Sequence, residues 1–370
     1  MSEQKQKLSI ALLGSGIFAR EQHLPAILEC ADTVQLKAIY SRSIASAEKL
    51  TAAAKEAGLQ DVEAYASESK DHDLEALLRR EDIDAVIICL PIPVQPSIIR
   101  ACLGAGKHVL SEKPIAPTLS AARELLLFSQ RPETPAFLAT TAHTHVTSAL
   151  WAVAENYRFQ GAWGYARTRI EGLGRILNFN VRVASMVEPE TNKYFATSWR
   201  KTPSFPGGFI MDGGVHQVAG LRMLLGEDEV IERVSAFSRC NQEHLPPVDT
   251  VNAIMRTKAG TVGTFSLGFG TTDNCYEFSV ACERGVVVVG GGGKVTVRPS
   301  EKGAQEEVKT ISGNSSVKEE LMAFAKGVLK GEIDGRQTPE EAWRDLELIE
   351  KMLQSGEKNG ETMEVTGKME

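Results

Sequence analysis

Two short segments carry residue types and spacings suited to proton chemistry. Glu112-Lys113-Pro114 joins a carboxylate and an ammonium to a proline that restricts the backbone. Lysine is rarely buried without a function, and Lys113 could donate a hydrogen bond to a substrate hydroxyl or carbonyl. In the sequence DGGVH, Asp212 and His216 lie four residues apart, which puts both on one face of a helix. A carboxylate there can hold and charge-balance an imidazole that titrates near neutral pH, so the pattern predicts general acid–base catalysis.

Each of these residues also has a structural interpretation, which the pattern alone leaves open. Asp212 could be the N-cap of a helix, and His216 a half-buried histidine with satisfied hydrogen bonds. A second histidine pair, His143-x-His145, has the spacing of metal ligands. No acid or cysteine stands beside this pair, and the six cysteines include no C-x-x-C pair, so we expect no metal site.

The chain begins with an element that could hold a phosphate. Leu8–Leu13 is a short apolar run typical of a buried parallel strand, and Gly14-Ser15-Gly16 and a helical pattern follow it. Gly14 would permit the tight turn, and Gly16 would let a pyrophosphate approach the backbone. Ala19 is an accepted small residue at the third position of the dinucleotide fingerprint. The sequence therefore predicts a dinucleotide site at the first strand.

The end of the second predicted strand, residues 34–40, indicates which dinucleotide is bound. NAD-binding folds place an acid here, which accepts hydrogen bonds from the ribose 2′-hydroxyl. This chain has Ser41 and Arg42 instead, a hydroxyl and a guanidinium that suit a 2′-phosphate. The alternative is a solvated arginine in a turn. We interpret the pair as a preference for NADP.

The remaining apolar runs predict where these side chains meet. Strands expected at residues 85–90 and 108–110 end at Pro91 and at the Glu112–Pro114 segment. Carboxyl ends of parallel strands share one edge of a sheet, where ligands dock in open α/β folds. We expect a doubly wound parallel-sheet domain over residues 1–157. Residues 158–370 should form an α+β domain on a mainly antiparallel open sheet, with helices at 162–171, 215–225, 317–329 and 339–353.

Composition excludes several classes of protein. The chain has 370 residues, 42% of them hydrophobic and 24% charged, which is ordinary for a globular protein with two domains. A net charge of −7 argues against binding to nucleic-acid backbones. The polar start MSEQKQK resembles no secretory signal, and no apolar run approaches membrane-spanning length. We therefore expect a cytoplasmic protein with reduced cysteines.

An ordered set of motifs resembles a known family. GSGIFA, CLPIPVQ, AGKHVLSEKP, AVAENYRF, TSWR and GGFIMDGGVHQ are similar to the glucose–fructose oxidoreductase, inositol dehydrogenase and MocA (Gfo/Idh/MocA) family, most of all to its fungal cytosolic NADP-dependent members. The resemblance implies that Lys113 assists hydride transfer, that His216 is the general acid/base and that Asp212 supports it. It implies cofactor or pocket contacts for a larger set: Gly14, Gly16, Ile17, Phe18, Ser41, Arg42, Leu90, Pro91, Gln95, Glu112, Lys113, Asn156, Trp199 and Arg200.

The chain departs from the family pattern at three places. Many members have histidine at Gln95 and asparagine at Ile92, both on the pocket wall, and Arg131–Leu150 has no counterpart in that pattern. We expect an NADP(H)-dependent oxidoreductase acting on the carbinol or carbonyl carbon of a small sugar, polyol or aldehyde. The alternatives are a non-catalytic NADP-binding regulator and a reductase of a bulkier substrate, of biliverdin or dihydrodiol type. The resemblance also implies a homodimer formed through the C-terminal sheet.

Overall fold

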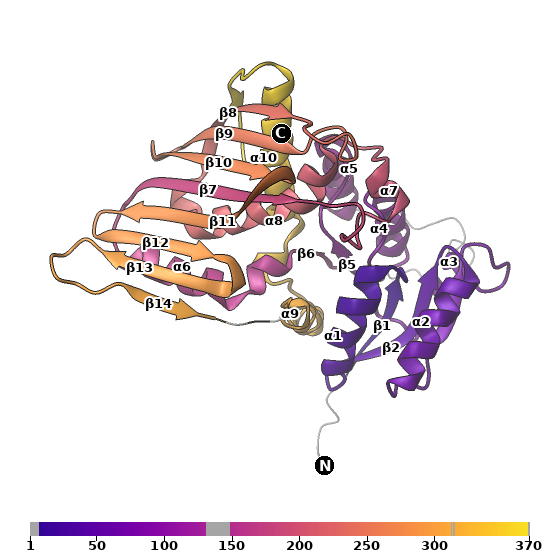
Figure 1. The fold of residues 1–370 in the computed structure, drawn as a ribbon. Helices are drawn as coiled ribbons and strands as arrows, with labels where there is room; N and C mark the ends of the chain where they lie inside the picture. Colours follow the sequence, from indigo (N-terminus) through magenta and orange to yellow (C-terminus); the bar gives the residue numbers. More distant parts are fainter. Residues whose placement is uncertain (1–6, 131–148, 312, 314, 369–370) are drawn as a thin grey trace, which may run out of the picture. The chain divides into compact units, whose positions relative to one another are not determined.

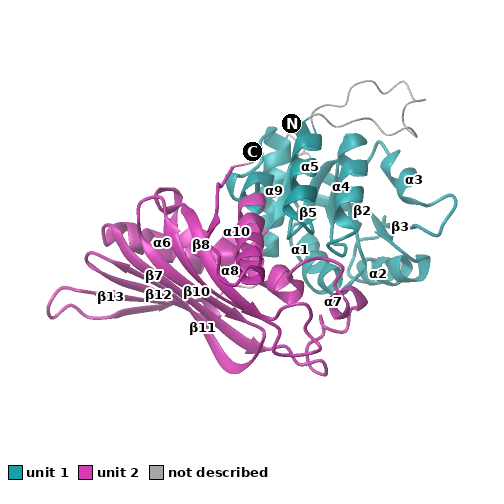
Figure 2. Cartoon of the chain, turned by 90° about the horizontal axis from the view of Figure 1, so that it is seen from above, with its two compact units in different colours: residues 1–154, 317–342 teal, residues 155–316, 343–370 magenta. Residues whose placement is uncertain are grey.

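The computed structural model describes residues 7–130, 149–311, 313 and 315–368. The chain forms two compact units, residues 1–154 with 317–342 and residues 155–316 with 343–370 (Figure 2). The domain boundary expected between residues 157 and 158 stays a prediction. Most of the segment Arg131–Leu150, including His143 and His145, lies outside the described residues.

The first unit is built on six parallel strands in the order β3-β2-β1-β4-β5-β6. This is the 3-2-1-4-5-6 order of dinucleotide-binding sheets, so the predicted doubly wound parallel sheet is confirmed. Residues of the central strands are almost all buried, as expected where helices cover both faces. The strands are β1 Leu8–Leu13, β2 Val34–Ser41, β3 Glu63–Ala66, β4 Ala85–Ile88, β5 His108–Glu112 and β6 Trp151–Ala154.

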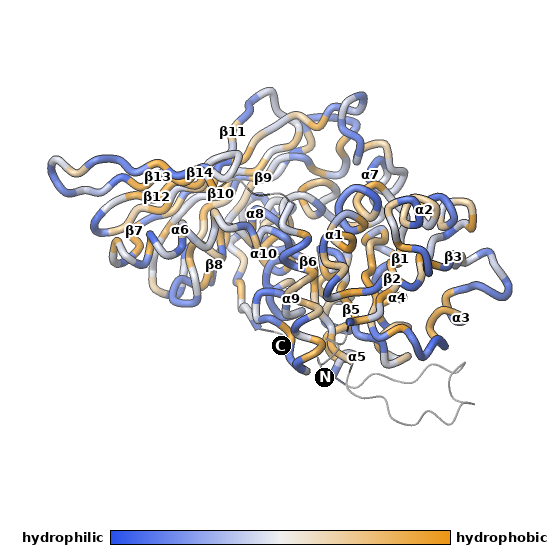
Figure 3. Tube along the Cα trace, turned by 90° about the horizontal axis from the view of Figure 1, so that it is seen from below, coloured by the Kyte–Doolittle hydropathy of each residue, from blue (hydrophilic) through white to orange (hydrophobic). Residues whose placement is uncertain are grey.

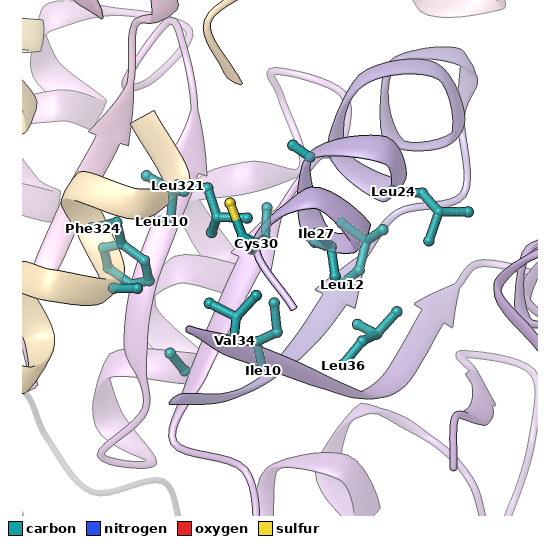
Figure 4. Packing of buried hydrophobic residues seen from close by; sticks show 14 of the residues in the cluster. Ile10, Leu12, Leu24, Ile27, Cys30, Val34, Leu36, Leu110, Leu321 and Phe324 are labelled. Carbon is teal, nitrogen blue, oxygen red and sulfur yellow. The ribbon is translucent and has the colours of Figure 1, made fainter. Parts of the chain in front are cut away.

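Helices from two distant parts of the chain complete the first unit. A π-helical turn, Ala19–His23, runs directly into the first α-helix. Leu321 and Phe324 from a helix late in the sequence pack into the same core as Ile10, Leu110 and Cys30 (Figure 4). The apolar strands stand out against the polar loops in Figure 3. The helices are α1 Leu24–Glu29, α2 Ile44–Glu56, α3 Leu74–Leu78, α4 Gln95–Gly104, α5 Leu119–Gln130 and α9 Val317–Lys330.

The second unit is a nine-stranded sheet in the order β14-β13-β12-β11-β7-β10-β9-β8-β15 (Figure 1). Every neighbouring pair is antiparallel except β10 and β7, so the predicted mainly antiparallel sheet is confirmed. Its strands are β7 Ile176–Met186, β8 Ile231–Arg239, β9 Thr250–Thr257, β10 Val262–Gly268, β11 Gly270–Cys282, β12 Gly285–Gly290, β13 Lys294–Pro299, β14 Glu307–Thr310 and β15 Met363–Glu364.

Helices cover one face of this sheet. Trp163 is fully buried, with its ring edge-on to Phe278 of β11 at a centroid distance of 4.9 Å. The helices are α6 Gly161–Gly172, α7 Ser198–Lys201, α8 Gly208–Leu225 and α10 Pro339–Glu357, and a 3-10 turn, η3, spans Asn156–Phe159. Among the described residues, no helix has the length and apolar character needed to cross a bilayer.

The sequence pattern missed or misplaced several elements. It gave no strand for β3, because EAYA is only four residues long and lies between polar loops. It began the helix predicted at residues 215–225 at Val215, whereas α8 begins at Gly208. Glycine lowers intrinsic helix propensity, so the run GGFIMDGG does not read as helical. Close packing of these glycines against neighbouring side chains offsets their low helix propensity.

Candidate functional site

The turn after β1 has space above its backbone. Gly14 has φ +124°, and a Cβ there would lie 2.1 Å from the Cys89 carbonyl oxygen, so only glycine fits. A Cβ on Gly16 would meet nothing within 4 Å. Ile17 and Phe18 are half-buried and open the helical segment. The turn therefore leaves its backbone accessible to a bulky group at Gly16, as a pyrophosphate requires.

The end of β2 combines a buried hydroxyl with an exposed guanidinium. Ser41 shares a hydrogen bond of 2.7 Å with the Ser15 hydroxyl, which ties β2 to the glycine turn. Arg42 is exposed, and within the described part of the chain its guanidinium has no ion-pair partner. One acid does reach this region, because Glu68 accepts a hydrogen bond from the Ile44 amide at 2.8 Å. Sequence order could not show that acid, since it follows β3.

The turn after β4 leads to a buried amide. The Pro91 carbonyl accepts hydrogen bonds from Val94 and Gln95 amides at 2.9 and 3.3 Å, and Leu90 and Pro91 are half-buried. Gln95, the first residue of α4, is only 1% exposed. Neither atom of its side-chain amide has a hydrogen-bond partner among the described residues. Leaving such a group unsatisfied costs about 1–3 kcal/mol, so a ligand with polar groups fits this position.

The carboxylate at the end of β5 contacts a buried histidine of the π-helical turn. Glu112 Oε1 lies 2.8 Å from Nε2 of His23, which is fully buried in the π-helical turn. The Phe18 ring packs edge-on against the same imidazole. Lys113 follows Glu112, is half-buried and precedes a cis peptide bond to Pro114. Because β2, β1, β4 and β5 are parallel neighbours, all the sequence-predicted residues of this unit gather at one sheet edge.

The DGGVH motif lies inside the first turns of α8. A Cβ on Gly213 would lie 2.9 Å from the Phe269 ring, and one on Gly214 would lie 2.6 Å from the Leu267 side chain. The glycine pair therefore lets the helix approach β10 closely. Asp212 is 7% exposed and lies inside α8, whose N-cap is Gly207, so Asp212 is not an N-cap.

Asp212 is paired with an arginine that stacks on aromatic rings. Arg200 Nε donates to Asp212 Oδ2 at 2.7 Å. The Arg200 guanidinium carbon lies 3.9 Å from the Trp199 ring centroid and 5.3 Å from that of Tyr194. Trp199, Arg200 and Asp212 therefore form one group in the second unit. Asn156 donates from its side chain to the Ser315 carbonyl at 2.6 Å, which anchors the end of η3.

His216 has a carboxylate partner that the sequence did not identify. Its Nδ1 lies 2.7 Å from Oε1 of Glu155, which is 2% exposed. The Tyr157 ring stacks on the imidazole at 4.7 Å and 17°. Glu155 and Tyr157 belong to the motif ENYRF. Glu155 and His216 are 61 residues apart, so the sequence spacing does not indicate their contact. That Asp212 supports His216 stays a prediction.

The chain matches two family models along most of its length. The first is described as oxidoreductase family, NAD-binding Rossmann fold, and covers residues 8–137. The second is described as oxidoreductase family, C-terminal alpha/beta domain, and covers residues 167–365.

Individual relatives agree with these models. The dehydrogenase FPY6 of Fusarium mangiferae is 40% identical over 95% of this chain and 97% of its own. A dTDP-3,4-didehydro-2,6-dideoxy-alpha-D-glucose 3-reductase of Actinomadura kijaniata is 26% identical over 93% and 94%. The crystal structure of an oxidoreductase from Thermotoga maritima superposes with a TM-score of 0.83 at 26% identity, covering 98% of this chain and 99% of that one.

Proposed function

The chain belongs to the Gfo/Idh/MocA oxidoreductase family, and from this premise we propose that it is an NADP(H)-dependent dehydrogenase or reductase. Its substrate would be a small sugar, polyol or aldehyde, reacting at a carbinol or carbonyl carbon. The observation that carries the proposal is the shared sheet edge, where open space at Gly16 and the half-buried Lys113 occur together. The 3-reductase relative, named for a deoxy sugar, supports the substrate class.

The chain's residues fit a dinucleotide at three points. Gly14, Gly16, Ile17 and Phe18 would face the pyrophosphate, where the turn leaves open space. Ser41 and Arg42 would bind the 2′-phosphate, and among the described residues the Arg42 guanidinium has no ion-pair partner that would compete for it. The buried amide of Gln95 would gain hydrogen bonds that it does not make to any described residue. Further contacts are proposed for Leu90, Pro91, Glu112, Lys113, Asn156, Trp199 and Arg200.

The bound nicotinamide supplies or accepts the hydride, and the protein's residues manage the proton. Lys113 donates a hydrogen bond to the substrate oxygen, which stabilises negative charge developing there during reduction. His216 gives a proton to that oxygen during reduction and takes it back during oxidation. Asp212 balances the charge of Arg200 and supports His216 from one helical turn away.

Steady-state rates test this proposal. A panel of aldehydes, ketoses and polyols is scanned for NADPH consumption or formation, and the best substrate is used with variants. We expect Lys113→Ala and His216→Ala each to lower kcat/KM by roughly 10²–10⁴, the usual contribution of a positioned acid or base. NADPH affinity should change less than about tenfold, because other residues hold the phosphates.

Two further variants complete the test. Asp212→Asn should cause a milder loss, and His72→Ala, at an exposed histidine, should have no effect. Wild-type rates in both alanine variants would refute the assigned roles and favour the non-catalytic regulator.

The proposal also includes a homodimer and a cytoplasmic location. On the nine-stranded sheet, side chains alternate between a buried and an open face. The open face exposes Ile254 (60%) and Phe237 (65%) beside hydroxyl and amide side chains such as Thr264 and Asn180. Large exposed apolar side chains on the open face of a sheet suit contact with a second copy of the chain.

A further inference from the structure

The segment after β6 places a buried carboxylate against the imidazole of His216. Glu155 is the residue before η3, and its side chain is 3% exposed, whereas that of His216 is 22% exposed. Their contact, Oε1 to Nδ1, measures 2.7 Å. Because one ring nitrogen is held by a buried carboxylate, Nε2 is the nitrogen left for a ligand.

The hydrogen bonds around Glu155 favour its role as an acceptor. The same oxygen, Oε1, also accepts from the Tyr157 amide at 3.1 Å. A backbone amide can only donate, and two donors converging on one oxygen stabilise an ionised carboxylate. With Glu155 ionised, His216 must carry its proton on Nδ1 when neutral. Nε2 then has the lone pair that a general base requires.

Aromatic side chains fix the plane of the ring. Tyr157 stacks on His216 at 4.7 Å and also on Trp163 at 5.7 Å. Tyr276 of β11 hydrogen-bonds to Tyr157, and its pKa is raised by burial, by Tyr157 and by the negative charge of Glu155. On α8 itself, Asp212 lies one helical turn before His216 and accepts a hydrogen bond from Arg200 of α7.

We propose that Glu155 is the positioning residue of the general acid/base His216: it orients the imidazole, selects its tautomer and stabilises its protonated form. The inference rests on the proposed function, since it assigns His216 a proton to carry. It assigns to Glu155 the direct contact with the imidazole, whereas Asp212 holds Arg200 and supports His216 only from one helical turn away.

His216 exchanges one proton with the substrate oxygen in each direction of the reaction. In reduction, the carbonyl carbon gains a hydride from the reduced cofactor, and the carbonyl oxygen takes the proton from Nε2 of the imidazolium. His216 becomes neutral and keeps the Nδ1 proton on its hydrogen bond to Glu155. In oxidation, Nε2 removes the hydroxyl proton while the hydride leaves the carbinol carbon. Glu155 itself stays ionised in both directions.

The pH dependence of Glu155→Gln tests this role. A neighbouring negative charge stabilises the imidazolium, so the protonated form of His216 should be less stable once that charge is removed. Reduction needs the imidazolium, so the basic limb of the pH profile of kcat/KM should move to lower pH by about 1 unit or more. Oxidation needs the neutral ring, so its acid limb should move in the same direction. At pH 7 we expect the rate of reduction to fall about 10²-fold or more, because the amide also permits the wrong tautomer.

Two matched variants separate positioning from folding. Glu155→Asp keeps the charge at a shorter reach, so it should lower kcat but leave the pH limb near its wild-type position. Glu229→Gln makes the same carboxyl-to-amide change at another buried acid of this unit, which is bonded to Thr257 and Thr261. It should leave the limb unmoved. If Glu155→Gln does not fold, the pH profile of Glu155→Asp is the test. A basic limb displaced by about 1 unit or more from its wild-type position in Glu155→Asp would overturn the proposal.

A measurement without turnover keeps this inference separate from the proposed function. The chain has seven histidines, and selective ¹⁵N labelling with His216→Gln assigns the His216 ring signals. We expect the Nδ1-protonated tautomer in the wild type and the loss of that preference in Glu155→Gln. A tautomer that Glu155→Gln leaves unchanged, or an Nε2-protonated ring in the wild type, would overturn the proposal. A tautomer that depends on Glu155, with no turnover of any substrate, would support Glu155's role and refute the oxidoreductase function.

Discussion

Arg42 provides a direct test of cofactor choice. Its guanidinium is exposed, lies at the end of β2 and has no ion-pair partner within the described part of the chain. A 2′-phosphate placed there would accept two parallel hydrogen bonds from the guanidinium fork. The change is Arg42→Ala, which removes that fork and shortens an exposed side chain without touching the hydrogen bond between Ser15 and Ser41.

The size of the effect follows from the exposure of the site. A hydrogen bond to a charged group contributes about 1.5–3 kcal/mol, and exposure to solvent favours the lower end. Coulomb's law in water gives about 1 kcal/mol per unit charge pair at 4 Å, so a phosphate dianion gains about 2 kcal/mol. Both routes lead to about 10–30-fold weaker NADPH binding. NADH lacks the phosphate, so its affinity should change less than about twofold.

Titration calorimetry of both cofactors measures the difference. The gap between NADPH and NADH in the wild type should shrink as salt rises from 50 to 200 mM, since exposed charges are screened. Glu68→Gln is the matched control, because it removes an acid that is bonded close to this turn and should strengthen NADPH binding slightly. Equal wild-type affinities, or an Arg42→Ala loss that is the same for NADH, would refute the reasoning.

Two other predictions concern stability and assembly. Burial lowers the pKa of His108 below 6.5, and its Nδ1 accepts a hydrogen bond from the Leu150 amide at 3.0 Å. The unfolded chain therefore binds this proton more readily, so the contribution of His108 to the free energy of unfolding should be complete above about pH 6.5 and decline as the pH falls. Urea melts at pH 7 and pH 5 should show a smaller loss of stability for His108→Asn than for the wild type. An equal loss in both proteins would contradict this prediction. Light scattering after gel filtration should show a wild-type dimer that Ile254→Asp converts to a monomer, whereas a monomeric wild type would rule out the sheet interface.

The first sheet was predictable because its signals are local. Runs such as Ala85–Ile88 are apolar throughout, and each ends at glycine, proline or polar residues, so strand and edge follow from the sequence. Gly14 and Lys113 were placed at that edge by the same reasoning. The parallel order of strands then follows from the physics of the crossover connections.

The parts that were missed depend on contacts distant in sequence. Glu155 follows directly after β6, and only the fold brings it to His216. The start of α8 was missed because helix propensity penalises glycine, whereas here Gly213 and Gly214 make room for Phe269 and Leu267. His23 gave no signal, since its partner Glu112 lies 89 residues away.

The packing of α9 has a consequence for how the protein is made. Leu321 and Phe324 contribute to the core of the first unit, yet they are translated after all of residues 155–316. The apolar surface that they cover stays exposed while the second unit emerges from the ribosome. The first unit therefore completes its folding only after about residue 342 has been released, so the two units are coupled during synthesis, and a chain stopped at residue 157 would lack part of its own core.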